Sequence, residues 1–303
     1  MGRGDHYDVR ARTVLITGAA NGIGAETARQ LGRKGARLAL LDRDEAGLER
    51  VAADSGADAA TFVADVTRVD DLKSAVEATV ERFGGIDVAL ANAGVAHIGT
   101  AESMAVEEFE RTIEVNLLGV WRTLRTVMPH VIKRRGYVIA VASLAARVHA
   151  PLTAPYAASK AGVEALVNAM RLEVEPRGVR AGVAYFGYID TGMVDRGFSH
   201  PAARMLRERT SSRATQPVPA ARAAAAIVRG IERRSRRVIA PRRVIPLVLL
   251  PTAVVNALIE SQLRRADFPE VMQVALEAET GSRAAAEAAA PAETARAGAA
   301  PAP

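Results

Sequence analysis

A tyrosine and a lysine stand four residues apart in YAASKAGVEALVNAMRLEVE, which covers residues 156–175. The segment has a helical pattern, and residues i and i+4 share a helix face, so Tyr156 and Lys160 would point the same way. A phenol ionises near pH ~10, and a nearby ammonium favours the phenolate and lowers that value. Tyr156 could then accept a hydroxyl proton as a general base. An isolated Tyr-x-x-x-Lys pair is usually an ordinary surface feature, so this chemistry needs support from the rest of the chain.

A glycine-rich turn near the N-terminus has the form of a dinucleotide site. In TVLITGAANGIGAETARQLGRKGARLALLDRD (13–44), an apolar run precedes Gly18, Gly22 and Gly24, and a helical pattern follows them. These glycines would allow a tight turn, let the backbone approach a pyrophosphate and pack the helix against the strand. The helix N-terminus would then present free N–H groups to the phosphates.

An acidic residue, Asp42, closes the second apolar run of this segment. Its carboxylate could accept hydrogen bonds from both ribose hydroxyls of an adenosine and would repel a 2′-phosphate, so it favours NAD over NADP. Two alternatives stay open. Asp42 could simply cap the helix that starts near Asp44, and Arg43 could pair with the 2′-phosphate of NADP.

The elements that would position these residues alternate along the first two thirds of the chain. Apolar runs typical of buried strands occupy 13–17, 37–41, 60–64, 86–91, 137–142 and 179–186, followed by a short seventh at 237–240. Apolar residues at helical spacing fill 22–34, 69–83, 106–133, 155–176 and 220–235. This alternation predicts an α/β fold: a doubly wound, mostly seven-stranded parallel sheet, Rossmann-like, with helices on both faces.

Further residues complete a set that resembles the short-chain dehydrogenase/reductase superfamily, in its compact single-domain branch. The members in chain order are the glycine motif TGAANGIG (17–24), the turn NAG (92–94), Asn116 in EVNLLGV, Ser143 after the fifth predicted strand, and the pair Tyr156 and Lys160. The resemblance spans about 13–191. Because the members occur together in this order and spacing, we interpret the pair as catalytic.

The resemblance implies a role for each member of the set. Tyr156 would exchange the proton of the reacting hydroxyl, aided by the charges of Lys160 and of an oxidised nicotinamide, and Lys160 would also bind the nicotinamide ribose. Ser143 would hydrogen-bond the substrate oxygen, and Asn116 would anchor a water in a proton relay to Lys160. The residues implied in cofactor binding are Gly18, Asn21, Gly22, Ile23, Gly24, Asp42, Arg43, Asp65, Val66, Asn92, Ala93, Gly94, Tyr156, Lys160, Gly187, Ile189 and Thr191.

Two parts of this cofactor set have other interpretations. Asp65, at the end of the third predicted strand, is expected to contact adenine by resemblance, but it could equally cap the next helix. After the sixth predicted strand, YFGYIDTGM has Phe186 where the family usually has proline, although Gly187 and Thr191 remain. Contact of Thr191 with the nicotinamide carboxamide is an expectation from the resemblance.

Composition divides the chain into four parts. Residues 1–12 are a charged N-terminal extension, and 13–243 form the Rossmann-like domain, with an irregular substrate loop at about 188–219. An apolar, helical extension covers 244–281. From 282 to 303, Ala, Pro, Glu and Thr dominate without an aromatic residue, so this tail is expected to be disordered.

The C-terminal extension bears on the choice of substrate. RRVIPLVLLPTAVVNALIESQL (242–263) continues from a cluster of six arginines between Arg233 and Arg243, and Pro246 and Pro251 argue against a spanning helix. The segment could pack on the sheet edge or at a subunit interface, wall an apolar substrate pocket, or rest with 233–263 on an anionic membrane surface. The last two interpretations favour a bulky hydrophobic alcohol or ketone, steroid- or lipid-like, over a sugar.

The composition of the 303 residues excludes several functions. Cysteine is absent, which excludes disulfides, thiolate metal sites and a cysteine nucleophile, and the five histidines show no metal-ligand spacing. A net charge of +6 with 4% aromatic residues gives no nucleic-acid-binding pattern. The charged first dozen residues show no secretory signal, so we expect a cytoplasmic protein, with peripheral membrane contact as a variant.

Together these features predict an NAD-dependent oxidoreductase that interconverts a secondary alcohol and its ketone by hydride transfer. A non-catalytic dinucleotide-binding sensor or scaffold, and an epimerase or dehydratase on the same fold, are the alternatives. The resemblance also implies a homodimer or homotetramer that pairs through the helices at 105–133 and 155–176.

Overall fold

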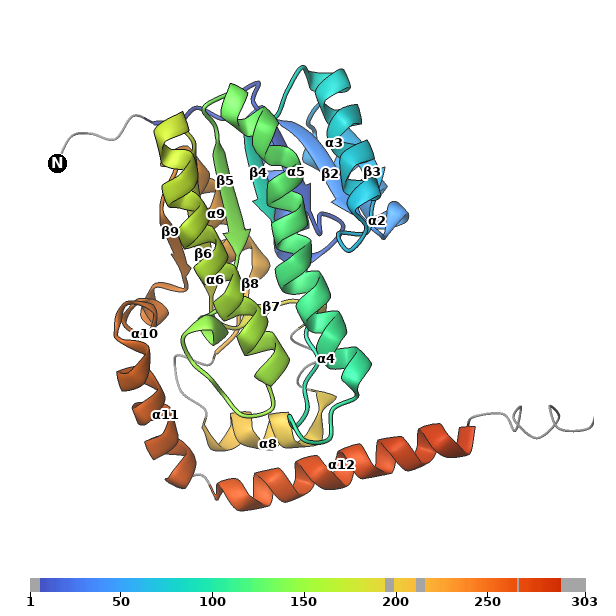
Figure 1. Ribbon diagram of the computed structural model, residues 1–303, viewed down its shortest axis with the longest axis vertical. Coiled ribbons are helices and arrows are strands. Elements are labelled where there is room, and N and C mark those ends of the chain that lie inside the picture. Colours follow the sequence, from blue (N-terminus) through green and yellow to red (C-terminus); the bar gives the residue numbers. More distant parts are fainter. Residues whose placement is uncertain (1–5, 194–198, 211–215, 266, 290–303) are drawn as a thin grey trace, which may run out of the picture.

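The computed structural model describes residues 6–193, 199–210, 216–265 and 267–289 (Figure 1). Within these residues lies a parallel seven-stranded sheet of order β3-β2-β1-β4-β5-β6-β9. The chain winds outward from β1 to β3, returns to β4 beside β1 and winds outward again, which confirms the predicted doubly wound fold. The strands are β1 (Thr13–Thr17), β2 (Arg37–Asp42), β3 (Ala59–Val63), β4 (Val88–Ala91), β5 (Tyr137–Val141), β6 (Arg180–Phe186) and β9 (Arg237–Ala240).

Helices cover both faces of the sheet, as strands that are apolar on both sides require (Figure 1). Successive strand residues face opposite sides, so Val14 and Ile16 belong to one core and Leu15, between them, to the other. The first core is closed by α1 (Gly22–Gly32), α2 (Glu45–Ser55) and α9 (Ala220–Glu232). The second is closed by α3 (Val69–Phe83), α5 (Gly119–Lys133) and α6 (Ala154–Val174).

A π-helical turn at Glu114–Leu118 joins α4 (Val106–Ile113) to α5. The sequence pattern predicts one helix over 106–133, and helical residues do run through this range without a gap. The hydrogen-bonding pattern nevertheless changes in the middle, where Asn116 lies. Such π-turns are frequent at functional sites, because the extra residue re-aims the side chains around it.

The segment after β6 is more regular than its glycines and prolines predict. Ile189–Asp190 (β7) pairs in parallel with Val218–Pro219 (β8), and α8 occupies Pro201–Arg209. The prediction of an irregular loop over 188–219 is therefore wrong for α8. Proline suits the first turn of a helix, and the residues that follow it, AARMLRER, are mostly strong helix formers.

In the described part of the chain beyond β9, a 3-10 turn (Arg242–Val244) is followed by α10 (Ile245–Leu249), α11 (Thr252–Arg265) and α12 (Phe268–Ala289). Pro246 lies in the first turn of α10 and Pro251 directly precedes α11, and the two helical segments meet at 113°. Over the described residues, none of the individual helices is both long and apolar enough to cross a bilayer.

The last helix, α12, continues past Ser282 to Ala289. The expected disorder from 282 onward is therefore wrong for residues 282–289. Their sequence, SRAAAEAA, is rich in alanine, the strongest helix former, and this local propensity outweighs the low capacity of the stretch to bury apolar surface. Residues 290–303 of the predicted tail lie outside the described residues.

Candidate active site

The predicted catalytic residues meet at the carboxyl end of β5. Ser143 follows this strand and begins a short 3-10 turn, where its Oγ accepts a hydrogen bond from the backbone N–H of Ala145 at 3.1 Å. Tyr156 and Lys160 lie one turn apart near the start of α6, and the Tyr156 hydroxyl is hydrogen-bonded to Ser143. The Lys160 ammonium donates to the carbonyl of Val141, the last residue of β5, at 2.9 Å. Strand and helix thus hold the three side chains together.

Burial controls the protonation of the Tyr–Lys pair. Lys160 is 3% exposed, and burial lowers its pKa to about 8. Burial also raises the pKa of Tyr156, the hydrogen bond from Ser143 lowers it in part, and the neighbouring Tyr188 raises it again. The Lys160 ammonium, 5.6 Å from the centroid of the Tyr156 ring, does not reverse this shift. The protein's own groups therefore favour the neutral phenol, whereas the pKa lowering expected from the sequence depends on the oxidised nicotinamide as well as on Lys160.

Asn116 is fully buried in the π-turn, and its amide is bound on both sides. Its Oδ1 accepts from the N–H of Val95 at 2.8 Å, and its Nδ2 donates to the Val95 carbonyl at 2.9 Å and to Ser159 Oγ at 3.1 Å. The side chain thereby clamps the segment after β4 to α6. A water relay through Asn116 stays a prediction. The second lone pair of Asn116 Oδ1 could accept the hydrogen bond of such a water.

The glycine turn is packed too tightly for side chains. A Cβ on Gly24 would lie 2.1 Å from the Gly18 carbonyl oxygen, and one on Gly18 would lie 2.8 Å from the Cα of Ala93, with Gly18 at φ +67°. Asn92 ties the turn to β4 by donating to the carbonyls of Thr17 and Gly18 at 3.1 and 3.0 Å. The NAG turn and the glycine turn therefore form one unit.

The N-terminus of α1 is open to a ligand. Its N-cap residue, Asn21, makes no side-chain cap, and its Nδ2 donates to Asp44 at 3.2 Å. The first N–H groups of a helix have no partner within the helix, so they are available to an anion such as a phosphate.

Asp42 ends β2 beside this turn. Its carboxylate accepts from the N–H groups of Ala20, Arg43 and Asp44 at 3.0, 2.7 and 3.2 Å. The cap of α2 is Asp44, which accepts from the N–H of Gly47 at 2.9 Å, so Asp42 is not the helix cap that its alternative interpretation requires. The three backbone donors fix the Asp42 carboxylate at the strand end, where ribose hydroxyls of a dinucleotide would lie.

The carboxylate of Asp65 lies close to two arginines. Its Oδ1 accepts from the N–H and the hydroxyl of Thr67, and its Oδ2 lies 3.3 Å from Arg111 and 3.7 Å from Arg43. Partial burial by itself raises the pKa of Asp65, but these hydrogen bonds outweigh burial and the pKa is lowered. The N-cap of α3 is Arg68, so Asp65 is not a helix cap either. No motif in the sequence points to Arg111, which α4 brings to this carboxylate.

These residues border a cavity of about 420 Å³, which fits the adenosine half of a dinucleotide in its chemistry. Its lining residues are Gly18, Asp42, Arg43, Asp44, Ala64, Asp65, Val66, Ala93, Gly94, Val95, Arg111 and Val115. Other predicted cofactor residues lie outside it: Ile23 follows Gly22 in the first turn of α1, and Ile189 is buried in the core. Thr191 approaches the glycine turn, 3.3 Å from where a Cβ on Gly22 would stand.

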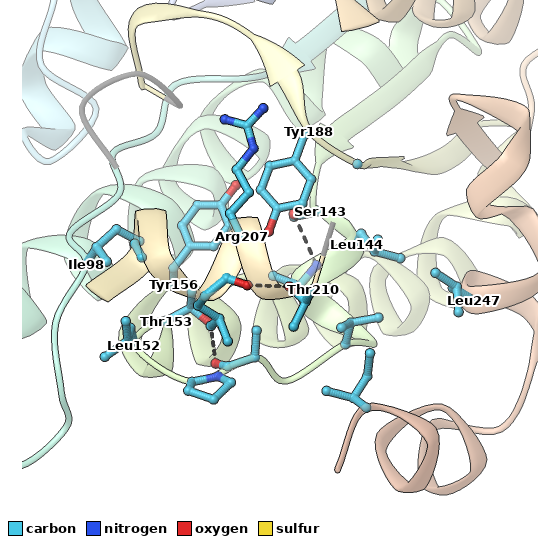
Figure 2. A pocket seen from close by; sticks show the side chains of 18 of the residues that line it. Ile98, Ser143, Leu144, Leu152, Thr153, Tyr156, Tyr188, Arg207, Thr210 and Leu247 are labelled. Carbon is cyan, nitrogen blue, oxygen red and sulfur yellow. Dashed lines mark hydrogen bonds between the residues drawn. The ribbon is translucent and has the colours of Figure 1, made fainter. Parts of the chain in front are cut away.

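A second, larger cavity of about 650 Å³ opens in front of Ser143 and Tyr156 (Figure 2). Its walls come from the segment 144–153, from α8, and from α10 and α11, which supply Leu247, Val255, Ile259 and Leu263. Phe186 and Gly187 line it from the end of β6, so the departure from the family's proline adds an aromatic wall. Among the described lining residues, Arg207 of α8 carries the one formal charge. The sequence motifs give no sign of the α8 residues.

Comparison with known proteins agrees with this geometry. Residues 12–201 match the short chain dehydrogenase family. The chain is 34% identical over 208 residues to 3beta-hydroxysteroid dehydrogenase 1 of Eggerthella lenta, covering 67% of this chain and 80% of that protein. It is 36% identical over 202 residues to trans-4-hydroxycyclohexanecarboxylate dehydrogenase of Sinomonas cyclohexanicum, covering 63% and 78%. The crystal structure of 3-ketoacyl-(acyl-carrier-protein) reductase from Brucella melitensis complexed with NADH has a TM-score of 0.69 at 27% identity, covering 77% and 97%.

The chain therefore belongs to the short-chain dehydrogenase/reductase superfamily of oxidoreductases, as its motifs predict. The family match ends at residue 201, within α8. Helices α9 to α12 lie beyond it, and two of them, α10 and α11, form part of the larger cavity.

Proposed function

We propose that this protein uses NAD to interconvert a secondary alcohol and its ketone on a bulky hydrophobic substrate. The observation that carries the proposal is the position of the Tyr–Lys pair between the two cavities. Tyr156 lines the larger cavity, and Lys160 lies 3.5 Å from where a Cβ on Gly94, a residue of the smaller cavity, would stand. A cofactor in the smaller cavity would extend past Lys160 toward Tyr156.

When bound, NAD supplies the group that accepts a hydride from the substrate carbon and carries it away. Ser143 and Tyr156, already hydrogen-bonded to each other, together bind the substrate oxygen and orient its carbon. In ketone reduction Tyr156 donates its proton, which suits the neutral phenol that burial favours. In alcohol oxidation Tyr156 accepts the proton, and the positive charges of Lys160 and of the oxidised cofactor offset the cost of the phenolate.

Two contacts support NAD over NADP. The Asp42 carboxylate is fixed by backbone donors at the strand end, where it accepts ribose hydroxyls and repels a 2′-phosphate. Arg43, the competing candidate, points its guanidinium to within 3.7 Å of Asp65. A 2′-phosphate would have to draw Arg43 away from that carboxylate.

The apolar lining of the larger cavity supports a hydrophobic substrate. Leucine, isoleucine, valine and alanine supply more than half of its described lining residues, which favours a substrate with a large apolar surface. Two relatives are named as dehydrogenases of a 3β-hydroxysteroid and of a hydroxycyclohexanecarboxylate, both cyclic alcohols. We therefore propose a steroid- or lipid-like alcohol or ketone as the substrate class.

A panel of alcohols tests this proposal directly. Purified protein is incubated with NAD or NADP and with steroid alcohols, long-chain secondary alcohols or sugars, and the absorbance of the reduced nicotinamide is followed. We expect reduction of NAD with apolar secondary alcohols. Dinucleotide binding without turnover across the whole panel would favour the sensor alternative, and turnover of sugars alone would overturn the substrate class.

We further propose a homodimer or homotetramer built through α4, α5 and α6. Large apolar side chains are exposed on these helices, with Val106, Phe109, Trp121 and Leu172 at 64, 37, 42 and 63%. Burying them between copies would remove this surface from water. Light scattering at micromolar concentration tests the assembly, and a mass equal to one chain would contradict it.

A further inference from the structure

The bend between α10 and α11 carries an exposed apolar surface. Leu249, Leu250, Val254 and Leu258, here called the apolar elbow, have exposed fractions of 55, 40, 47 and 54%. Single exposed leucines are ordinary, but four large apolar side chains within ten residues form a patch of the kind that soluble monomers rarely leave uncovered.

The two faces of α11 differ in what they contact. Val255 is fully buried and lines the larger cavity with Ile259. Val254 and Leu258, four residues apart, face outward together. Leu258 also belongs to the cavity lining, so it stands at the rim. The apolar elbow is therefore continuous with the mouth of the substrate cavity.

Positive charge borders the apolar elbow. Exposed Arg242 and Arg243 directly precede α10, and Arg243 keeps its place by donating to the carbonyl of Gln216. From 233 to 259 the sequence has no acidic residue. The first one, Glu260, lies 4.0 Å from Arg264, so its charge is offset locally.

The cluster of six arginines seen in the sequence divides in space. Four of them, at positions 233, 234, 236 and 237, lie at the amino end of β9, whereas Arg242 and Arg243 follow its carboxyl end. A strand rises about 3.3 Å per residue, so β9 separates the two groups by more than a strand-to-strand spacing. Arg242 and Arg243 are therefore the two arginines of the cluster that lie on the side of α10 and the apolar elbow. Arg147, which donates to Thr252 at the start of α11, is paired with Glu164.

We propose that the apolar elbow docks on the surface of an anionic lipid membrane, with the mouth of the substrate cavity facing the acyl chains. This proposal rests on the hydrophobic substrate class proposed above. Apolar side chains flanked by arginines fit the boundary between headgroups and acyl chains. Together the two helical segments are long and apolar enough for a bent span, and the 113° bend between them also fits a pair that lies in the interface. A two-fold contact whose axis passed near Arg242 and Arg243 would instead bring each close to its own equivalent, where like charges repel.

Vesicle co-sedimentation of the full chain tests the docking. The vesicles contain either phosphatidylcholine alone or phosphatidylcholine with one quarter phosphatidylglycerol. The apolar variant is the double substitution Leu250→Glu and Val254→Glu, at two positions outside the cavity lining. The charge variant is Arg242→Ser with Arg243→Ser, and the control is Val63→Glu, at an exposed apolar residue at the end of β3, outside the helices proposed as the oligomer interface.

We expect the wild type and the control to sediment with anionic vesicles and the apolar variant to stay in solution. The charge variant should bind about 30-fold more weakly, since each arginine near an anionic surface contributes about a factor of five. Lack of wild-type binding, or unchanged binding of the apolar variant, would overturn the proposal. The proposal would also fail if the apolar variant lost its oligomers in light scattering but still bound vesicles.

Turnover of a soluble alcohol without vesicles separates this proposal from the proposed function. The apolar variant should keep wild-type turnover of that alcohol, because Leu250 and Val254 do not line the cavity. Loss of vesicle binding with turnover intact would support the docking surface. Absence of turnover in the wild type would refute the dehydrogenase assignment, whatever the vesicles show.

Discussion

The two cavities of the molecule are built in different ways. The smaller one is formed mainly by the ends of parallel strands and the turns that follow them, and its lining combines carboxylates, arginines, glycines and small aliphatic residues. The larger one is lined mostly by apolar side chains, from the segment 144–153 and the end of β6 and from α8, α10 and α11, which lie outside the central sheet. The sheet and its turns therefore form the cofactor side, whereas the substrate side also depends on helices added after β6. The family match ends at residue 201, so α10 and α11 lie beyond it.

The largest effect is expected where the two cavities meet. Tyr156→Phe removes only the hydroxyl, so the cofactor cavity and the substrate cavity keep their shapes. A positioned general acid–base group typically contributes ~10²- to 10⁴-fold, and we expect a loss of turnover in that range. Cofactor affinity, measured by fluorescence titration, should stay within a few-fold of wild type. Near-normal turnover would show that the proton passes through another group.

A smaller effect is expected from the cofactor side alone. Asp42→Ala removes a charged acceptor for the ribose hydroxyls, and hydrogen bonds to charged groups contribute ~1.5–3 kcal/mol, so NAD should bind about 10- to 100-fold more weakly. NADP should bind better than to the wild type. Titration of both cofactors against wild type, Asp42→Ala and Arg43→Ala checks this. If the wild type prefers NADP and Arg43→Ala abolishes NADP binding, Arg43 governs the site and the NAD assignment fails.

The substrate side should respond without any change in cofactor binding. Ile259→Trp places a larger side chain in the cavity, so KM for bulky alcohols should rise about tenfold, the effect of ~1.4 kcal/mol of lost fit, with small alcohols unaffected. The matched control is Val254→Trp, at an exposed position on the outward face of the same helix. Equal KM values for bulky alcohols in both variants would show that α11 does not wall the substrate site.

The fold and the catalytic set follow from short-range patterns in the sequence. Strand periodicity places Ser143 at the end of β5, and helical spacing puts Tyr156 and Lys160 on one helix face. The positions of these three residues could therefore be predicted. The protonation of the pair could not, because it depends on burial by distant elements. Burial raises the pKa of Tyr156, whereas the spacing alone suggests that Lys160 lowers it.

Part of each cavity could not be predicted from the sequence, because it depends on long-range contacts. Arg111 meets Asp65 across 46 residues, and no local motif marks such a pair. In α8 the signals of a loop and a helix competed, since glycines and prolines flank AARMLRER. Its residues Leu206 and Arg207 line the substrate cavity, and α12, far along the chain, packs against α8, with Val271 and Ala275 buried beside Ala202.

The last effect concerns Lys160, which lies between the cavities, and it appears in the free energy of unfolding as a function of pH. Burial lowers the pKa of Lys160 to about 8 from 10.5, so between these pH values the unfolded chain binds more protons than the folded one. The free energy of unfolding should therefore rise with pH from 8 to 10.5, by at most ~1.4 kcal/mol per pH unit, and stay flat below pH 8 as far as this group is concerned. Thermal unfolding of wild type and of Lys160→Met at pH 7, 8, 9 and 10 isolates the contribution, because the methionine does not titrate. Lys73→Met, at a lysine 54% exposed, is the control for the loss of a lysine side chain. If the difference between wild type and Lys160→Met is constant from pH 8 to 10, Lys160 is not desolvated, and the two cavities are joined through a site open to water.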